Sequence, residues 1–430
     1  MPHDPQPGAD ASPSKRPSGW LSRLGPGLIT GAADDDPSGI ATYSQAGAQF
    51  GLATLWTLLL TYPLMVGIQA VSARIGRVTG HGLAGNMRRH YPRWLLQATV
   101  ALLLVANVAN IAADLSAMGD AARLVLGGPA HLYTVLFGLV ALLLQVFVPY
   151  ARYVRFLKWL TLVLFAYVAV LFSLQIPWAD VARATFWPRL STDTGYVTTV
   201  VAILGTTISP YLFFWQASQE VEDMQGKRPP ERSLLEAPQE AQQNFRRIRL
   251  DTGFGMAVSN AVAFFIMLTA ALTLHRHGVT DIQSSAQAAE ALRPIAGELA
   301  FGLFSLGIIG TGMLAIPVLA GSAAYAMAGA FGWSGSLESS LREAKAFYSI
   351  IAAAMVAGIA LGFSPLDPIK ALFWSAVLNG VIAVPIMVVM MLMVANRQVM
   401  GRFVASRRLK VLGWAATALM GAAVLVMLAF

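Results

Sequence analysis

The feature that most constrains this chain is a polar interruption inside an apolar segment long enough to span a membrane. Residues 25–51 read GPGLITGAADDDPSGIATYSQAGAQFG, with three consecutive aspartates, 34–36, near the middle. Carboxylates in a spanning segment are costly to bury and by default mark a functional site. Pro37 and Gly39 also break the helix there, which frees backbone carbonyls at the depth of the carboxylates. Because hard cations bind carboxylate and carbonyl oxygens, the segment predicts a cation site in a broken transmembrane helix.

The composition places the chain in the class of integral membrane proteins. Of its 430 residues, 56% are hydrophobic and 12% are charged, whereas soluble domains carry about 25% charged residues. The chain has no cysteine, which excludes disulfides, thiolate metal sites and thiol nucleophiles. Its sequence also contains no nucleophile–base pattern, no metal-binding histidine group and no P-loop. We therefore expect neither an enzyme nor a nucleotide-driven pump, and no cofactor, so that any transport is driven by gradients.

Apolar runs of about 20 residues, the length that crosses a bilayer, predict an all-α membrane protein. Eleven runs qualify, at 26–48, 53–73, 94–118, 132–149, 156–175, 196–219, 252–274, 297–325, 346–364, 370–395 and 409–428. The proline-rich residues 1–24 are expected to form a disordered cytosolic tail, and residues 25–430 to form the transmembrane transporter domain.

The basic residues indicate how the spans are oriented. If the N-terminus lies in the cytosol, the outside segments hold only a minority of the 30 lysines and arginines, namely Arg123, Arg183, Arg189, Arg276, Arg293 and Lys370. The positive-inside rule therefore predicts a cytosolic N-terminus. The net charge of +8 follows from this topology and does not indicate a nucleic-acid partner. We expect a monomer in the lipid bilayer of a bacterial inner (plasma) membrane.

The sixth expected span is interrupted like the first. Residues 205–211 read GTTISPY and place a glycine, hydroxyl side chains and a proline at mid-membrane depth. Spans one and six correspond if spans 1–5 (about 25–175) and 6–10 (about 196–395) are two repeats of opposite orientation, followed by an extra helix at about 409–428. Paired interrupted segments in two inverted halves mark the central site of a transporter.

The residues at the two breaks predict the ligands of the cation. Asp36 directly precedes Pro37, where the chain is pushed out of helical geometry. Its carboxylate and the Ala33 carbonyl, one turn earlier, are therefore expected to converge on an ion. Thr206 and Ser209 offer hydroxyl and carbonyl oxygens from span six. Such oxygens suit Mg²⁺, Ca²⁺ or Mn²⁺.

Other polar residues are candidates for a further contact or for proton transfer. Each of the three aspartates, Asp36 included, can instead cap the second half-helix, since Asp is a preferred N-cap. For Asp34 and Asp35, a place in the site, this capping role and a place in an outer vestibule all stay open. In span three, Asp114 lies on the same helical face as Asn110. A lone carboxylate on such a face can relay protons, contact a second cation or serve as a paired structural group. Asn379 in span ten is a weaker candidate of the same kind.

The first span resembles that of the Nramp divalent-metal transporters. That family has Gly-Pro early in the segment, then Asp-Pro-Gly-Asn and Gln-Ala-Gly-Ala-Gln-Phe-Gly, and this chain has the last block unchanged at 45–51. The runs RRIRLDTGFGMAVSNAVAFFIML (246–268) and DPIKAL (367–372) add to the likeness. The resemblance implies an inverted-repeat fold of eleven or twelve helices, shared with the amino-acid/sodium symporters. It also implies a central ion held between spans one and six.

The chain departs from the family at the ion site. Gly39 stands where the family has an asparagine ligand, and Ser209 and Tyr211 stand where it has methionine and histidine. Asp114 is retained, but Ala117 replaces a glutamate, so that the family's proton pathway is incomplete. This pattern resembles that of the Nramp-related magnesium transporters, which also lack the soft ligand. A site with one carboxylate and no sulfur suits Mg²⁺, which sheds its waters reluctantly.

The sequence thus predicts a gradient-driven importer of a hard divalent cation, Mg²⁺ first and Mn²⁺ second. Asp36 would be the charged ligand, and the carbonyls of Ala33 and Thr206, with Ser209 and water, would complete the shell. Two alternatives stay open. One is a cation-coupled symporter of a small organic solute, with aromatic residues such as Tyr211 lining its cavity. The other is a non-transporting Nramp-like sensor, against which the short segment after the last span argues.

Overall fold

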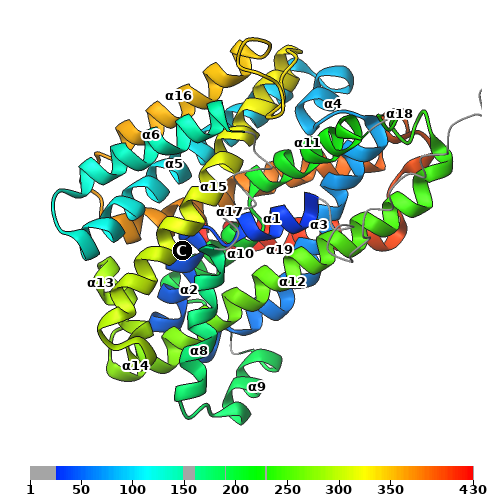
Figure 1. The fold of residues 1–430 in the computed structure, drawn as a ribbon. Coiled ribbons are helices and arrows are strands. Elements are labelled where there is room, and N and C mark those ends of the chain that lie inside the picture. Colours follow the sequence, from blue (N-terminus) through cyan, green and yellow to red (C-terminus); the bar gives the residue numbers. More distant parts are fainter. Residues whose placement is uncertain (1–25, 149–159, 189, 228–229, 430) are drawn as a thin grey trace, which may run out of the picture.

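A computed structural model describes residues 26–148, 160–188, 190–227 and 230–429, and every regular element within them is a helix (Figure 1). The α-helices are, in chain order, α1 (Pro26–Asp34), α2 (Pro37–Phe50), α3 (Trp56–Thr79), α4 (Leu83–His90), α5 (Arg93–Leu126), α6 (Ala130–Phe147), α8 (Phe165–Ser173), α9 (Trp178–Phe186), α10 (Thr194–Thr207), α11 (Pro210–Gly226), α12 (Ala241–Thr273), α13 (Ser285–Ala289), α14 (Arg293–Ala296), α15 (Ala300–Phe331), α16 (Lys345–Leu361), α17 (Pro368–Ala395), α18 (Arg397–Met400) and α19 (Arg407–Ala429). Short 3₁₀ helices are η2 (Gly51–Thr54), η3 (Leu160–Leu164), η4 (Pro238–Glu240), η5 (His275–His277), η6 (Glu290–Leu292), η7 (Gly297–Leu299) and η8 (Gly401–Phe403). The expected tail, 1–24, lies outside the described residues.

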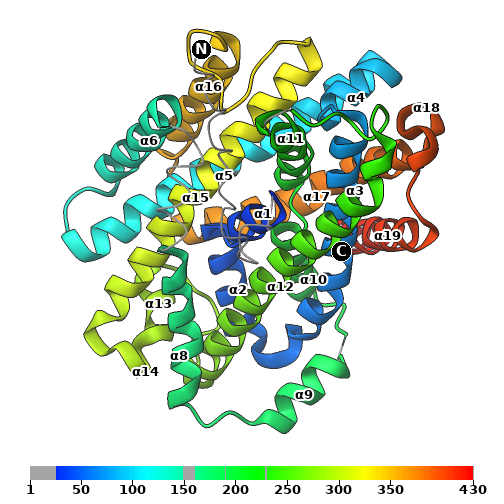
Figure 2. The ribbon, with the colours of Figure 1, turned by 45° about the vertical axis from the view of Figure 1, so that its right-hand side comes forward.

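The long helices pack in two groups that meet in the middle of the molecule (Figures 1 and 2). In the first group, α1 and α2 lie against α12, and α3 lies against α11 and α12. In the second group, α5 packs against α6, α15 and α16. Helix α17 contacts α2 and α10 on one side and α5 on the other, while α19 packs against α3 and α17. The two interrupted segments therefore lie where the groups meet.

Eight helical segments in the described part of the chain are long and apolar enough to cross a membrane. Each of the eleven expected spans overlaps a helix, but three fall short of that length. The first is divided between α1 and α2, the fifth keeps only Leu162–Ser173 among the described residues, and the ninth is the 17-residue α16. The protein is thus an all-helical membrane protein with multiple spans, and eleven stays our prediction for their number.

Helices approach each other closely where glycine removes the side chain. A Cβ built on Gly31 of α1 would lie 2.4 Å from the backbone of Gly255 in α12. A Cβ on Gly205 of α10 would lie 2.0 Å from the Ala376 carbonyl oxygen in α17. Small residues of this kind let helix backbones pack tightly in a membrane, where van der Waals contacts drive association. The close approach brings both broken helices against their neighbours.

Ion pairs tie together the helix ends on the side that we assign to the cytosol. Arg77 of α3 is fully buried, and it pairs with Asp223 of α11 at 3.1 Å and with Glu231. Arg247 of α12 pairs with Glu220 of α11. Burial of a charge is tolerated when the charge is paired in this way. These pairs hold the segment between α11 and α12 against the end of α3.

We predict that Gly31→Ala destabilises the protein, because the added methyl group would collide with the α12 backbone. Overpacking of this kind costs about 1–3 kcal/mol. Gly253→Ala, on α12 itself, is the matched control, because a Cβ there meets nothing within 4 Å. Thermal unfolding in detergent should show a lower midpoint for Gly31→Ala only. Equal midpoints for the two variants would contradict the close contact between α1 and α12.

Candidate metal centre

Both expected breaks are present in the structure. Residues 35–36 separate α1 from α2, and residues 208–209 separate α10 from α11. At these points Asp36 and Ser209 adopt extended backbone conformations, with ψ of 170° and 135°. Each is the N-cap of the half-helix that follows, and the first residue of that half-helix is a proline, which has no N–H to satisfy.

The prolines also determine which carbonyl groups are released. In a continuous helix, the carbonyls of Ala33 and Thr206 would accept from the N–H four residues on, but both of those positions are proline. A buried carbonyl that loses this partner needs another. The Ala33 carbonyl accepts from the Tyr211 hydroxyl at 3.1 Å, and the Thr206 carbonyl accepts from the Ser209 hydroxyl at 2.9 Å. Both carbonyl ligands predicted from the sequence are therefore oxygens that the breaks release.

Asp36 is 1% exposed and connects the two breaks. Its Oδ1 accepts from the Gly39 N–H at 2.8 Å and from the Ser38 hydroxyl at 2.6 Å. Its Oδ2 lies 3.1 Å from the Tyr211 hydroxyl, whose single proton is shared between this oxygen and the Ala33 carbonyl. Because the same hydroxyl contacts the Ala33 carbonyl, it marks a point where a carboxylate oxygen and a carbonyl oxygen converge. Convergence of two such oxygens is the arrangement that a hard cation requires.

The Thr206 hydroxyl of the second break lies beside Gly39 of the first. A Cβ on Gly39 would lie 3.3 Å from the Thr206 hydroxyl oxygen and 3.3 Å from the ring of Tyr43, so the two breaks touch here. Ser209 is buried, and its hydroxyl also approaches the Gly205 carbonyl at 2.8 Å. Its proton is therefore used by the carbonyls of the preceding half-helix, α10, while its oxygen keeps lone pairs for an ion.

Asp34 and Asp35 are also buried, and they share one partner on α12. The Ser259 hydroxyl lies 2.6 Å from Asp34 Oδ2 and 3.0 Å from Asp35 Oδ1. A hydroxyl has one proton and cannot donate to both carboxylates at once, so a second proton or a cation must complete the contact. Of the three aspartates considered as caps of α2, Asp36 is the N-cap, and its side chain accepts from the Gly39 N–H. Asp34 and Asp35 do not cap α2.

The contact between α1 and α12 follows a regular ladder that we did not predict. Its rungs are the pairs Gly27–Asp251, Gly31–Gly255 and Asp35–Ser259. The rungs are four residues apart on both helices, which places them on one face of each. The signal was present in the sequence as two matching series of small and polar residues, 27, 31, 35 and 251, 255, 259.

Asp114 of α5 is fully buried, and neither of its carboxylate oxygens has a hydrogen-bond partner among the described residues. A carboxylate in that position is costly unless a proton or a cation completes it. Asn110 and Asn379, by contrast, bond to each other between α5 and α17, at 2.8 and 3.1 Å. Their amides hold two helices together, whereas Asp114 keeps free acceptor capacity.

Within the described ranges, no group of three or more histidine, cysteine, aspartate or glutamate side chains could hold a metal ion. A cation at the breaks would therefore depend on one carboxylate together with carbonyl and hydroxyl oxygens and water. Mg²⁺ is usually bound in this way, because it keeps several of its waters.

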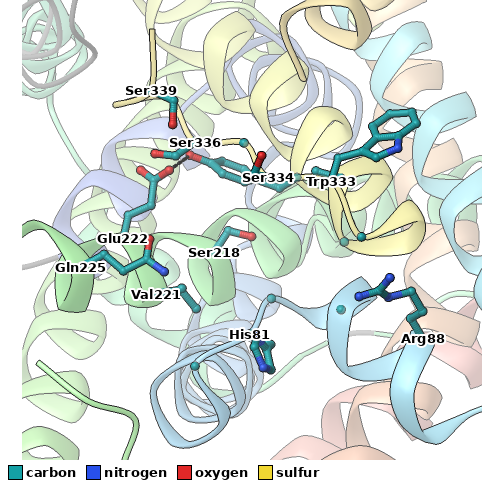
Figure 3. A pocket seen from close by; sticks show the side chains of 18 of the residues that line it. His81, Arg88, Ser218, Val221, Glu222, Gln225, Trp333, Ser334, Ser336 and Ser339 are labelled. Atoms are coloured by element: carbon teal, nitrogen blue, oxygen red, sulfur yellow. Dashed lines mark hydrogen bonds between the residues drawn. The ribbon is translucent and has the colours of Figure 1, made fainter. Parts of the chain in front are cut away.

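A cavity of about 420 Å³ lies on the side that we assign to the cytosol (Figure 3). Ser218 and Glu222 of α11 line one wall, and the loop that follows α15 lines another. Glu222 accepts hydrogen bonds from the Tyr325 hydroxyl at 2.5 Å and from the Leu337 N–H at 3.2 Å. At 1.5 Å per residue, Ser218 lies about 14 Å along the helix from the break at Ser209. The cavity therefore begins about two turns beyond the second break.

Solved structures of transporters share this fold. A manganese transporter of Eremococcus coleocola, in complex with an aromatic bis-isothiourea substituted compound, matches with a TM-score of 0.74 and 18% identity, over 95% of this chain and 87% of that one. MhsT in complex with L-phenylalanine matches with a TM-score of 0.58 and 14% identity, over 96% of this chain and 98% of that one. The chain is thus a multi-span helical membrane protein with the fold of these structures, and the expected all-α membrane fold is confirmed.

The family model for natural resistance-associated macrophage protein-like sequences matches residues 27–430. The chain therefore belongs to the Nramp family. The divalent metal cation transporter MntH of Klebsiella pneumoniae (strain 342) is 26% identical over 412 residues, which cover 93% of this chain and 92% of that protein. The family resemblance of the first span is confirmed, and the protein is a member of a transporter family and not an enzyme.

We predict that Ser259→Ala destabilises the protein, because it removes the hydroxyl that Asp34 and Asp35 share. A buried acceptor left without a partner costs about 1–3 kcal/mol. Ser259→Thr keeps the hydroxyl and should stay close to the parent protein. Ser349→Ala is a control at an exposed serine of α16. If the thermal midpoints of Ser259→Ala and Ser349→Ala are the same, the shared contact contributes nothing.

Proposed function

We propose that this protein is a gradient-driven importer of a hard divalent cation, with Mg²⁺ preferred and Mn²⁺ second. One observation carries the proposal: the Asp36 carboxylate and the Ala33 carbonyl converge on one point, which the Tyr211 hydroxyl of the second break occupies at 3.1 Å from each. Membership of the Nramp family supports it. So do the names of the similar proteins, a divalent metal cation transporter and a manganese transporter.

In the proposed site, Asp36 is the charged ligand. The carbonyls of Ala33 and Thr206, the Ser209 oxygen and water complete the shell. The ion takes the place of the Tyr211 hydroxyl as the common partner of Asp36 and Ala33, and the tyrosine keeps its proton. Asp36 and Ala33 need little rearrangement, because their oxygens already share this hydroxyl.

The preference for Mg²⁺ follows from the donor set. Carboxylate, carbonyl, hydroxyl and water oxygens suit Mg²⁺ and Mn²⁺, whereas a thioether favours softer ions. The second break offers a hydroxyl at Ser209, and Gly39 supplies no side-chain ligand. A site with one carboxylate and retained water matches the chemistry of Mg²⁺.

We propose that uptake does not depend on co-transported protons. The resemblance to the family assigns the proton pathway to three positions. Asp114 is present at one of them, while Ala117 and Tyr211 at the other two carry no carboxylate or imidazole. The membrane potential alone favours entry of a divalent cation, by about 2.3 kcal/mol per charge for each 100 mV. The cavity beyond the metal centre, lined by Ser218 and Glu222, would be the exit on the cytosolic side.

We further propose that residues of about 25–175 and 196–395 are inverted repeats, with an extra helix at about 409–428 after them. The helix contacts support two interlocked halves, because helices of each half pack on helices of the other. Helix α2 of the first half packs on α12 of the second, and α11 of the second half packs on α3 of the first. In the same way α5 packs on α17, and α15 packs on η3. Alternating access would then come from rocking of one helix group against the other around the site.

Asp36→Asn should abolish Mg²⁺ and Mn²⁺ uptake into proteoliposomes, because it removes the charged ligand while keeping the shape of the side chain. Loss of a paired buried charge costs about 3 kcal/mol or more, so we expect at least about a 100-fold lower rate. Glu298→Gln is the control, since this carboxylate is 90% exposed. Unchanged uptake by Asp36→Asn would overturn the site. Absence of ion uptake by the parent protein, with stabilisation by an organic solute, would favour the symporter instead.

The double change Gly39→Asn and Ser209→Met should shift selectivity toward Mn²⁺, because it adds an amide oxygen and a thioether. We expect the ratio of Mn²⁺ to Mg²⁺ uptake to rise by about tenfold or more. Ser349→Met, at an exposed position of α16, is the control for adding a thioether elsewhere. If the ratio is the same in both variants, the assigned ligands are wrong.

A further inference from the structure

A groove of about 810 Å³ lies between the start of α5 and the end of α15, apart from the metal centre. Its inner part is apolar. Leu96, Val100 and Leu104 line it from α5, and their four-residue spacing places them on one helical face. Met327 and Phe331 line it from α15. The wall formed by α5 extends over about 12 Å, at 1.5 Å per residue.

The mouth of the groove is basic. Arg88, Arg89 and Arg93 line it, and no acidic side chain is among the described residues that do so. All three arginines are exposed, and within the described ranges none of them takes part in an ion pair. Arg88 lies against the turn after α15, where a Cβ on Gly332 would collide with its guanidinium (Figure 3). Burial and then the charges of Arg89 and Arg88 lower the pKa of His81, on the other side of this cluster.

Aromatic side chains place this mouth at the depth of the lipid head groups. Trp94, next to Arg93, is 68% exposed, and Phe331 is 60% exposed. Phe331 stacks on Trp333 with ring centroids 4.8 Å apart. Tryptophan is enriched at the boundary between membrane and water, and the positive-inside orientation puts this end of α5 at the cytosolic leaflet.

We propose that the groove binds an anionic phospholipid of the cytosolic leaflet. Its phosphate lies at Arg88, Arg89 and Arg93, and one acyl chain lies along α5 and α15. Basic pockets between transmembrane helices on the cytosolic side recognise anionic head groups in this way. A soluble phosphate would use only the mouth and would leave the apolar wall without a partner. The lipid would connect α5 and α15 of the second helix group, whether or not the protein carries a metal ion.

Native mass spectrometry of the detergent-purified protein tests the inference. The protein is titrated with phosphatidylglycerol and, separately, with phosphatidylcholine of the same acyl chains. We expect one phosphatidylglycerol to bind at least about tenfold more tightly than phosphatidylcholine. Arg89→Gln with Arg93→Gln should weaken binding of phosphatidylglycerol about 30-fold, because each arginine near the surface contributes about a fivefold factor. Ala101→Trp fills the apolar part of the groove without changing its charge and should also abolish binding of phosphatidylglycerol.

Arg407→Gln with Arg408→Gln is the matched control, since both arginines are exposed at the start of α19 on the same side of the membrane. It should leave binding unchanged, and Arg89→Lys with Arg93→Lys should retain most of it. Equal binding of the two lipids would overturn the inference. So would a loss of phosphatidylglycerol binding in the control pair equal to the loss in Arg89→Gln with Arg93→Gln. Displacement of phosphatidylglycerol by glycerol 3-phosphate at the same concentration would also overturn it, because the site would then hold a soluble anion. Thermal unfolding of each variant identifies those that remain folded, and only these are compared.

Discussion

A backbone break at mid-membrane depth is the constraint on which the rest of this structure depends. Lipid offers no hydrogen bonds, so each group that a break releases must find a partner inside the protein. At the first break, the Asp36 carboxylate has two local hydrogen-bond donors, the N–H of Gly39 and the hydroxyl of Ser38. A third donor comes from the second break, where the Tyr211 hydroxyl contacts both the Ala33 carbonyl and the Asp36 carboxylate. The two interrupted segments must therefore lie side by side, and glycines at their helix interfaces allow it.

The buried carbonyl and carboxylate oxygens that need hydrogen-bond partners at the breaks are also the kind of ligand that a hard cation requires. Some buried carboxylates of this region lack a donor of their own: one Ser259 hydroxyl serves two carboxylates, and Asp114 has no partner among the described residues. A cation or additional protons correct this imbalance. Folding and ion binding are therefore linked in our proposal, because the groups that close the breaks also form the proposed site.

Sequence patterns predicted the breaks well, because proline and aspartate act locally: Pro37 and Pro210 release the carbonyls of residues four positions earlier. They did not predict the ladder between α1 and α12, because its rungs join residues more than 200 positions apart. They left the roles of Asp34 and Asp35 open, and the structure turns both toward α12 while Asp36 caps α2. Apolar length identified the long spans but could not fix the number of membrane crossings, since α16 has only 17 residues. The roles of the ligand residues stay a prediction.

The most direct test of the central claim is anomalous X-ray diffraction from crystals of the protein soaked in Mn²⁺. The account predicts one strong anomalous peak between the Asp36 carboxylate and the Ala33 carbonyl, in the place of the Tyr211 hydroxyl, and a decrease in its height when Mg²⁺ is added. A peak located elsewhere, for example between Asp34 and Asp35, or a peak that Mg²⁺ does not diminish, would contradict it.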